Sequence, residues 1–127
     1  MSYDTEDTIN WWTIAQADRW LDGEVSHYYQ IEPLAQDWAR VSKIGEELGE
    51  AIAELILSTG QNPRKDCSEE AMDAASIALL KELGDVAITA ILAIQHFTKH
   101  TENTKAVLMN AQAKLKSRVP DIYGGTA

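Results

Sequence analysis

One long apolar segment, from Ser68 to about His100, constrains the fold of this chain more than any other feature. At the angular spacing of a helix its apolar side chains point almost all the way round the axis, which predicts a buried helix. Only Lys81, Glu82 and Asp85 interrupt its centre. An ionised carboxylate in a protein interior is costly unless a cation or a hydrogen bond compensates it. The sequence therefore predicts a second element that supplies this compensation.

A second helical segment, predicted from Pro33 to about Ser58, carries an acidic face opposite an apolar face. Proline is favoured as the first residue of a helix, and the Gly, Pro and Asn of residues 59–67 are typical of a loop. A solvated acidic face on a surface helix is one explanation. However, like charges in one arc repel, and the basic residue that shares this arc is Lys43. The acidic face consists of Glu46, Glu47, Glu50 and Glu54.

Two long helices joined by a short loop are expected to pack antiparallel. This packing can set Glu82 and Asp85, one turn apart on the same side of their helix, against the acidic face of the earlier helix. A cluster of carboxylates without an imidazole is a hard-oxygen site that suits Mg²⁺ or Mn²⁺. Divalent cations would allow the acids of the apolar helix to stay ionised.

The fold class predicted from these patterns is all-α, an antiparallel helical bundle. Residues 1–31 are expected to hold a tail, a short peripheral helix and a connector, followed by a helical domain at 32–120 and a mobile tail at 121–127. Ser68 is a suitable N-cap for the apolar helix, and Thr101 for a last helix.

The short peripheral helix is predicted to start after Thr8 and to end near Leu21, with Gly23 as its terminator and residues 25–31 as the connector. Its tryptophans are expected to dock it on the bundle, because aromatic side chains bury large areas, and the alternative is that one of them lines a pocket for a flat ring. These tryptophans are Trp11, Trp12 and Trp20.

The net charge of −9 argues against nucleic-acid polymers and anionic membranes as partners, since both require a basic surface. Cys67 is the single cysteine, which excludes an intramolecular disulfide and fits a reducing compartment. The acidic N-terminus lacks the apolar run of a signal peptide, and the central charges leave apolar stretches too short for a membrane span. We therefore expect a cytoplasmic protein.

Two acidic motifs, EELGE at 46–50 and ELGD at 82–85, resemble the EExxE and ExxD pair of the MazG-type all-α nucleoside triphosphate pyrophosphohydrolases. The resemblance covers about Trp38 to Pro120, and the interval between the motifs is longer than is usual in that family. Three residues also match positions that are often basic in the family, namely Lys43, Lys114 and Arg118.

The resemblance implies a cluster of metal ligands for Mg²⁺, with Mn²⁺ as a substitute. It implies that Glu46 lies behind the ligands, binds a second metal ion or orients the attacking water, and Glu46 is accordingly the predicted catalytic residue. The reaction implied is hydrolysis of a nucleoside or deoxynucleoside triphosphate to the monophosphate and pyrophosphate. The ligands implied are Glu47, Glu50, Glu82 and Asp85.

The resemblance also implies substrate contacts and an assembly. Lys43, Lys114 and Arg118 would neutralise phosphate charge, and Trp38 or Trp12 would stack on the base, unless these indoles only pack in the core. Members of such families form homodimers or homotetramers in which two subunits complete a four-helix bundle. A chain with so much apolar helix surface and only two long helices would gain by such pairing.

Two other classes of protein fit parts of the pattern. A non-catalytic helical interaction module would use its acids only to pair with lysine and arginine. A di-iron carboxylate bundle needs Glu-x-x-His pairs, which neither acidic motif supplies. His96 is expected to be a satisfied or half-exposed helix residue rather than a ligand. Within the hydrolase class, nucleotide-pool house-cleaning, dCTP or dUTP hydrolysis and a related phosphoribosyl-nucleotide activity would all use the same acids.

Overall fold

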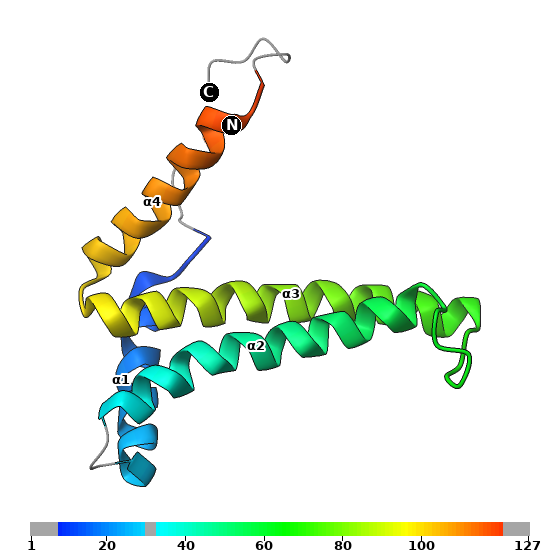
Figure 1. The fold of residues 1–127 in the computed structure, drawn as a ribbon, viewed down its shortest axis with the longest axis horizontal. Helices are drawn as coiled ribbons and strands as arrows, with labels where there is room; N and C mark the ends of the chain where they lie inside the picture. The colour runs from blue at the N-terminus through cyan, green and yellow to red at the C-terminus, as the bar shows by residue number, and fades with distance from the viewer. Residues whose placement is uncertain (1–7, 30–32, 121–127) are drawn as a thin grey trace.

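The computed structural model describes residues 8–29 and 33–120, and within these ranges all of the regular secondary structure is helical (Figure 1). The prediction of an all-α chain is confirmed for this part of the sequence. None of the described helices combines the length and hydrophobicity that a membrane span requires. The four helices are α1 (Trp11–Tyr29), α2 (Pro33–Ser58), α3 (Glu69–Thr98) and α4 (Thr101–Arg118).

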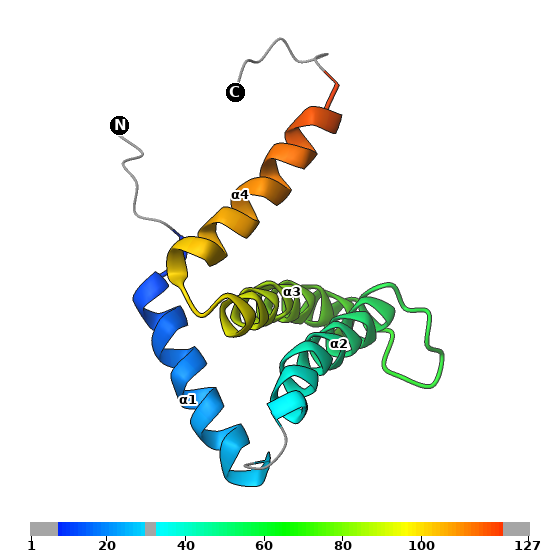
Figure 2. The same cartoon turned by 60° about the vertical axis from the view of Figure 1, so that its left-hand side comes forward.

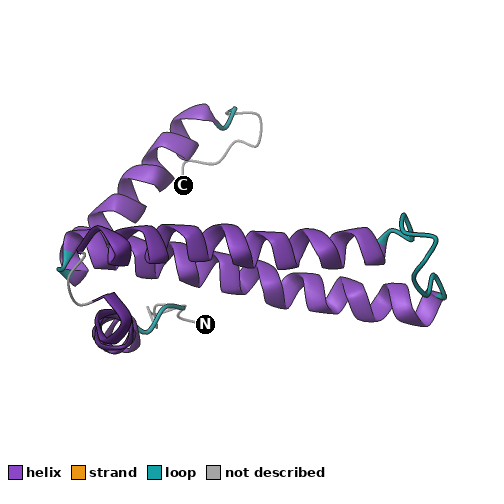
Figure 3. Cartoon of the chain, turned by 60° about the horizontal axis from the view of Figure 1, so that its bottom comes forward, coloured by secondary structure: helices purple, strands orange, loops and turns teal. Residues whose placement is uncertain are grey.

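Helices α2 and α3 form a long antiparallel hairpin, as the sequence predicts (Figure 3). The loop between them turns at Gly60, whose φ of 67° lies in the left-handed region that glycine adopts without steric cost. The Cys67 thiol contacts the backbone carbonyls of Gly60, Asn62 and Lys65 at 3.7, 3.4 and 3.3 Å and helps to hold the loop closed. The hairpin is the largest helix pair in the molecule and positions both acidic motifs.

Helix α1 crosses the end of the hairpin where α2 begins and α3 ends, and α4 leaves that end in a different direction (Figure 2). The turn into α4 depends on Lys99, which adopts a left-handed conformation with φ of 62° and donates its backbone N–H to Gln95. Thr104 is fully buried in this turn, and its hydroxyl donates to Gln95 Oε1 at 2.7 Å. Only the first turns of α4 are therefore anchored to the hairpin.

The first helix differs from its prediction at both ends. It begins at Trp11, and the Asn10 side chain accepts a hydrogen bond from the Thr13 N–H at 3.0 Å, so that Asn10 takes the capping role predicted for Thr8. The helix passes through Gly23 to Tyr29. A single helical glycine costs only about 1 kcal/mol relative to alanine, which is too little to end a helix that packs on two others. The connector prediction is therefore wrong for 25–29, and residues 30–32 lie outside the described part.

The caps of the later helices agree more closely with the sequence. The Ser68 hydroxyl accepts the Ala71 N–H at 3.2 Å and caps α3 as predicted. Helix α3 ends at Thr98, and the N-cap of α4 is His100 rather than Thr101, which is the first helical residue. The terminal segments 1–7 and 121–127, which the sequence assigns to tails, lie outside the described residues.

The expectation that α3 is buried on every side is wrong for the single chain. Ile77 and Leu80 are 72% and 71% exposed, because α2 covers only one side of α3 along the hairpin. The buried residues of α3 lie mostly near its C-terminal end, where α1 and α4 also contact it. We call the uncovered side chains the exposed apolar residues of the hairpin: Leu48, Ile52, Leu55, Ile77, Leu80, Leu83 and Ile88.

Candidate metal site and its surroundings

Three carboxylates meet near the middle of the hairpin. Glu47 comes from α2, and Glu82 and Asp85 lie one turn apart on α3. Their carboxylate oxygens lie within 4.8 Å of one another, and all three residues are half-buried. The antiparallel packing predicted from the sequence thus brings the two acidic motifs together.

Glu50 extends this group along α2. The negative charge of Glu47 raises the pKa of the Glu50 carboxyl, and a hydrogen bond with Glu82, a small burial effect and the charge of Glu82 raise it further. A carboxyl whose pKa is raised by its neighbours is one that lacks sufficient positive charge around it. The four predicted metal ligands therefore form one group, the acid cluster, defined as Glu47, Glu50, Glu82 and Asp85.

One oxygen of the acid cluster has no partner within the described ranges. It is Glu82 Oε2, which is buried in a side chain that is 16% exposed and receives no hydrogen bond there. A buried carboxylate oxygen without a donor is expensive, and a bound cation would compensate it. The donor set is oxygen only, which is the set that Mg²⁺ and Mn²⁺ prefer. The residues present therefore fit a hard divalent cation.

Two lysines lie at the rim of the acid cluster. Lys43 Nζ lies 3.0 Å from Glu46 and 3.2 Å from Glu47, and these hydrogen bonds raise the pKa of Lys43. Lys81 Nζ lies 3.4 Å from Asp85 and 3.6 Å from Glu82, but its side chain is 72% exposed. Exposed ion pairs of this kind contribute about 0 to 1 kcal/mol each. They leave Glu82 Oε2 without a partner.

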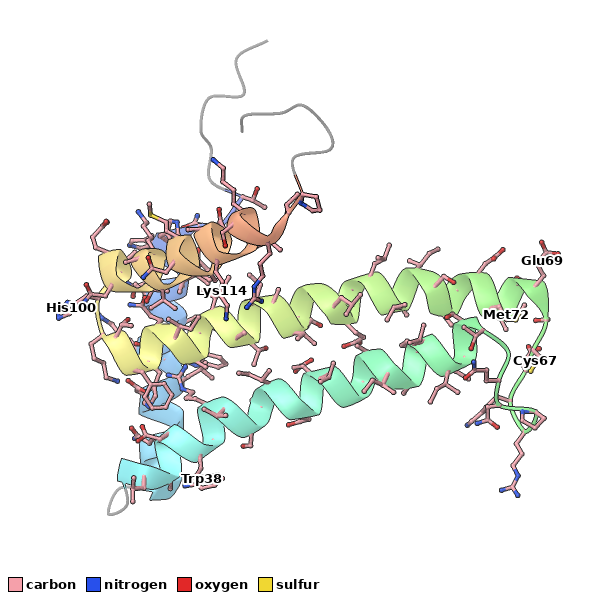
Figure 4. The ribbon with its side chains drawn as sticks, turned by 45° about the horizontal axis from the view of Figure 1, so that its top comes forward. Trp38, Cys67, Glu69, Met72, His100 and Lys114 are labelled. Carbon is pink, nitrogen blue, oxygen red and sulfur yellow. The ribbon has the colours of Figure 1, made fainter. Side chains whose placement is uncertain are left out.

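The residues predicted to contact a substrate fall into two groups. Trp38 is 73% exposed and lines an open groove of about 530 Å³ together with Lys43 and Glu46, so three of the predicted residues share one surface of α2. Lys114 and Arg118 are exposed residues of α4. Figure 4 shows Lys114 away from Trp38. No hydrogen bond or ion pair joins either of them to the acid cluster within the described residues.

The tryptophans of α1 do not dock the helix as a group. Trp12 and Trp20 are 72% and 61% exposed, so the docking prediction is wrong for both. Trp11 is partly covered, and Lys105 Nζ of α4 lies 5.5 Å from the centre of its ring. Helix α1 instead docks through its buried residues Ile14 and Asp18, because the face that they share is the face turned toward the hairpin.

A second group of charges lies where α1 crosses the hairpin, and the sequence patterns did not predict it. Arg40 Nη2 donates to Asp18 Oδ1 at 2.8 Å and to Asp22 Oδ1 at 2.9 Å, and His96 lies between Asp22 and Asp37. The sequence signal was present, since Asp18 and Asp22 share the inner face of α1 with Ile14. We call this group the end cluster: Asp18, Asp22, Asp37, Arg40, His96 and Lys99.

The end cluster is a poorer candidate for a metal ion than the acid cluster. Asp18, Asp22 and His96 lie close enough to share an ion, but the Arg40 guanidinium already contacts both carboxylates. A cation placed there would meet that fixed positive charge. His96 is buried and hydrogen-bonded, so it is a satisfied helix residue, as the sequence analysis expected.

No family model matches the chain, and no curated protein or solved structure matches it. The relation to the MazG-type hydrolases therefore remains a prediction from the two motifs.

Proposed function

We propose that this protein is a Mg²⁺-dependent nucleoside triphosphate pyrophosphohydrolase. The observation that carries the proposal is the acid cluster, in which four carboxylates from two facing helices lie close together and a buried oxygen of one of them, Glu82, has no partner among the described residues. Mg²⁺ bound by these four residues would polarise the triphosphate and activate a water molecule. Nothing else in the described part of the chain combines so much uncompensated negative charge with partial burial.

The residues around the acid cluster have roles that follow from their positions. Glu46 is exposed next to the cluster, where its carboxylate can orient a water molecule or accept its proton. Lys43, which already contacts Glu46 and Glu47, can turn its ammonium group toward a phosphate in the groove. The exposed indole of Trp38 lines the same groove and offers a flat surface for a base.

The proposal includes a homodimer or homotetramer. The exposed apolar residues of the hairpin are too many for a stable isolated pair of helices, and a second hairpin packed on them would complete a four-helix bundle. The same assembly would allow Lys114 and Arg118, which make no ion pair with the acid cluster in the described part of their own chain, to approach the acid cluster of a partner. An active monomer in size-exclusion chromatography with light scattering would contradict this assembly.

A non-catalytic interaction module is the second candidate, and the lysine contacts of the acids support it. In that case Lys43 and Lys81 would be the intended partners of Glu47, Glu82 and Asp85. The two candidates differ in their response to Mg²⁺, because only a protein with a metal site is stabilised by the free ion through mass action.

A substrate panel tests the proposed activity. The protein is incubated with canonical and modified nucleoside triphosphates, with and without Mg²⁺, and released pyrophosphate is measured together with the nucleoside monophosphate. We expect equal amounts of both products from at least one substrate, and none in the presence of EDTA. Release of inorganic phosphate instead of pyrophosphate, or no cleavage with either Mg²⁺ or Mn²⁺, would overturn the proposal. The same panel includes dCTP, dUTP and a phosphoribosyl-nucleotide, which separates the related activities.

A further inference from the structure

His96 occupies an unusual position at the crossing of three helices. Its side chain is only 4% exposed, and both of its ring nitrogens face carboxylates: Nδ1 lies 3.2 Å from Asp22 of α1, and Nε2 lies 2.7 Å from Asp37 of α2. The same Nδ1 also lies 3.3 Å from Lys99 Nζ. One ring therefore contacts α1, α2 and the residue that follows α3.

An imidazole ring cannot make all three of these contacts, with Asp22, Asp37 and Lys99, as hydrogen bonds at the same time. Ionised carboxylates only accept hydrogen bonds, and a lysine ammonium group only donates them. A neutral imidazole has one N–H, so it can donate from Nε2 to Asp37 and accept at Nδ1 from Lys99. An imidazolium has two N–H groups, so it can donate to Asp37 and Asp22 together, but it can then no longer accept from Lys99.

We infer that His96 is a proton-operated clamp that fastens α1 to the hairpin. In the protonated state, Nδ1 donates to Asp22 and Nε2 donates to Asp37, so the ring bridges α1 and α2. In the neutral state, Nδ1 accepts from Lys99, and the bond from the ring to α1 is lost. Arg40 contacts Asp18 and Asp22 in both states, so that loss of the proton loosens α1 without releasing it completely.

Charged groups of both signs face His96 from the helices packed around it. Helix α1 contributes Asp18 and Asp22, α2 contributes Asp37 and Arg40, and Lys99 follows α3. Three carboxylates thus face two fixed cations, and an imidazolium makes the end cluster neutral. In the first turns of α4, the charged pair Lys105 and Glu102 contact each other at 3.4 Å.

Asp22 stays ionised when the His96 ring carries its second proton. Burial acts to raise the pKa of Asp22, but the hydrogen bond from Arg40 and the charges of Lys99, Arg40 and His96 outweigh it and lower the pKa below its ordinary value. Asp22 therefore remains an acceptor for the protonated ring at mildly acidic pH. The inference does not depend on the proposed hydrolase activity.

Hydrogen exchange of α1 tests the clamp in the full chain. Histidine side chains ordinarily change charge between about pH 5 and 8, so exchange is measured at both ends of that interval and corrected for the intrinsic effect of pH. We expect the amides between Trp11 and Asp22 to be roughly tenfold better protected at the acidic end, as one hydrogen bond between charged groups implies. In His96→Gln this ratio should fall to about one, whereas the exposed His100→Gln should keep it. A ratio near one in the native chain, or an unchanged ratio in His96→Gln, would overturn the inference.

A second variant keeps the test decisive if His96→Gln does not fold. Lys99→Met removes both the donor that competes for Nδ1 and a neighbouring positive charge, and it changes a side chain that is 54% exposed. The proton should then be bound more tightly, so the pH midpoint of the change in α1 protection should move to higher pH. A midpoint that stays in place or moves to lower pH would contradict the two-state arrangement.

Discussion

The two charged groups of this molecule differ in how completely the chain compensates them. In the end cluster, Asp18, Asp22 and Asp37 are matched by Arg40, His96 and Lys99, and Arg40 makes two contacts shorter than 3 Å. In the acid cluster, four carboxylates have two lysines at their rim, and one buried oxygen has no partner. Within the described residues, each carboxylate of the end cluster contacts a basic side chain, although Arg40 Nε and Nη1 are buried without a partner. The acid cluster instead lacks positive charge.

This difference separates a structural role from a binding role. A buried charge network that is satisfied by its own chain fixes the packing of helices, and removal of one member leaves the others uncompensated. A network that is short of positive charge raises the free energy of the folded chain until a cation or a partner binds. The end cluster accordingly holds α1 on the hairpin, and the acid cluster is where an added ion should have its effect.

The largest expected effect comes from breaking the end cluster. Arg40→Met keeps the aliphatic part of the side chain but removes the charge, and it leaves Asp18 and Asp22 facing each other without their cation. Loss of one partner from a buried ion pair typically costs about 3 to 5 kcal/mol. Urea denaturation should show this loss, and Arg64→Met in the exposed loop serves as the control. A loss below about 1 kcal/mol would mean that the end cluster does not hold the fold together.

The next effect concerns turnover. Glu82→Gln keeps the shape of the side chain but removes its charge from the centre of the acid cluster, so pyrophosphate release should fall by about 100-fold or more. Helical circular dichroism should be unchanged, because the variant also removes a source of repulsion. Glu102→Gln, at an exposed acid of α4, is the matched control. Full activity in Glu82→Gln would remove this residue from the mechanism.

Mg²⁺ should stabilise the native chain, by a smaller free energy than the loss expected for Arg40→Met. At a free concentration 100 times the dissociation constant, a ligand that binds only the folded state contributes about 2.7 kcal/mol. The melting temperature should therefore rise when Mg²⁺ is added and fall when EDTA removes it. In Glu82→Gln the rise should be lost, whereas Arg64→Met should retain it. An equal rise in melting temperature in the native chain and in Glu82→Gln would mean that Mg²⁺ binds outside the acid cluster.

The smallest expected effect is a pH dependence of opposite sign in the two clusters, measured in EDTA. The charge of Glu47, and after it the hydrogen bond and charge of Glu82, raise the pKa of Glu50 above its ordinary value of 4.5. The folded state therefore binds the proton of the Glu50 carboxyl more tightly than the unfolded state does. Stability is therefore lost as the pH rises from 4.5 through the raised value. Glu50→Gln should remove this loss, and thermal melts between about pH 4 and 7 would show it. The same slope in Glu50→Gln would contradict the assignment.

For Asp22 the sign is reversed. Burial opposes the shift, but Arg40 and the other nearby cations lower the pKa below 3.8, so the stability from this carboxylate is present above pH 3.8 and is lost as the pH falls through the lowered value. Asp22→Asn should weaken the acid-induced loss of α1 protection in hydrogen exchange. If the variant and the native chain lose α1 at the same pH, Asp22 does not control this transition.

The agreement between sequence and structure is best where local chemistry decides. Pro33 at the first position of α2 and Ser68 at the N-cap of α3 act through neighbouring residues, so both were predicted from the sequence. The acid cluster could also be predicted, because Glu82 and Asp85 must face whatever packs against α3, and the loop brings α2 there. The error at Gly23 has the opposite cause, since contacts of α1 with distant helices outweigh a weak local signal.

The sequence by itself determined α2, α3 and their polar and apolar faces, because periodicity and capping are properties of short segments. The short loop between them also predicted that the two acidic motifs meet. Only the tertiary structure decided which faces are covered. His96 and Asp22 are far apart in the chain, and their contact depends on how α1 crosses the hairpin. The exposure of Ile77 and Leu80 likewise follows from where α2 lies. A helical pattern specifies a face that requires a partner, but it does not specify which partner covers that face.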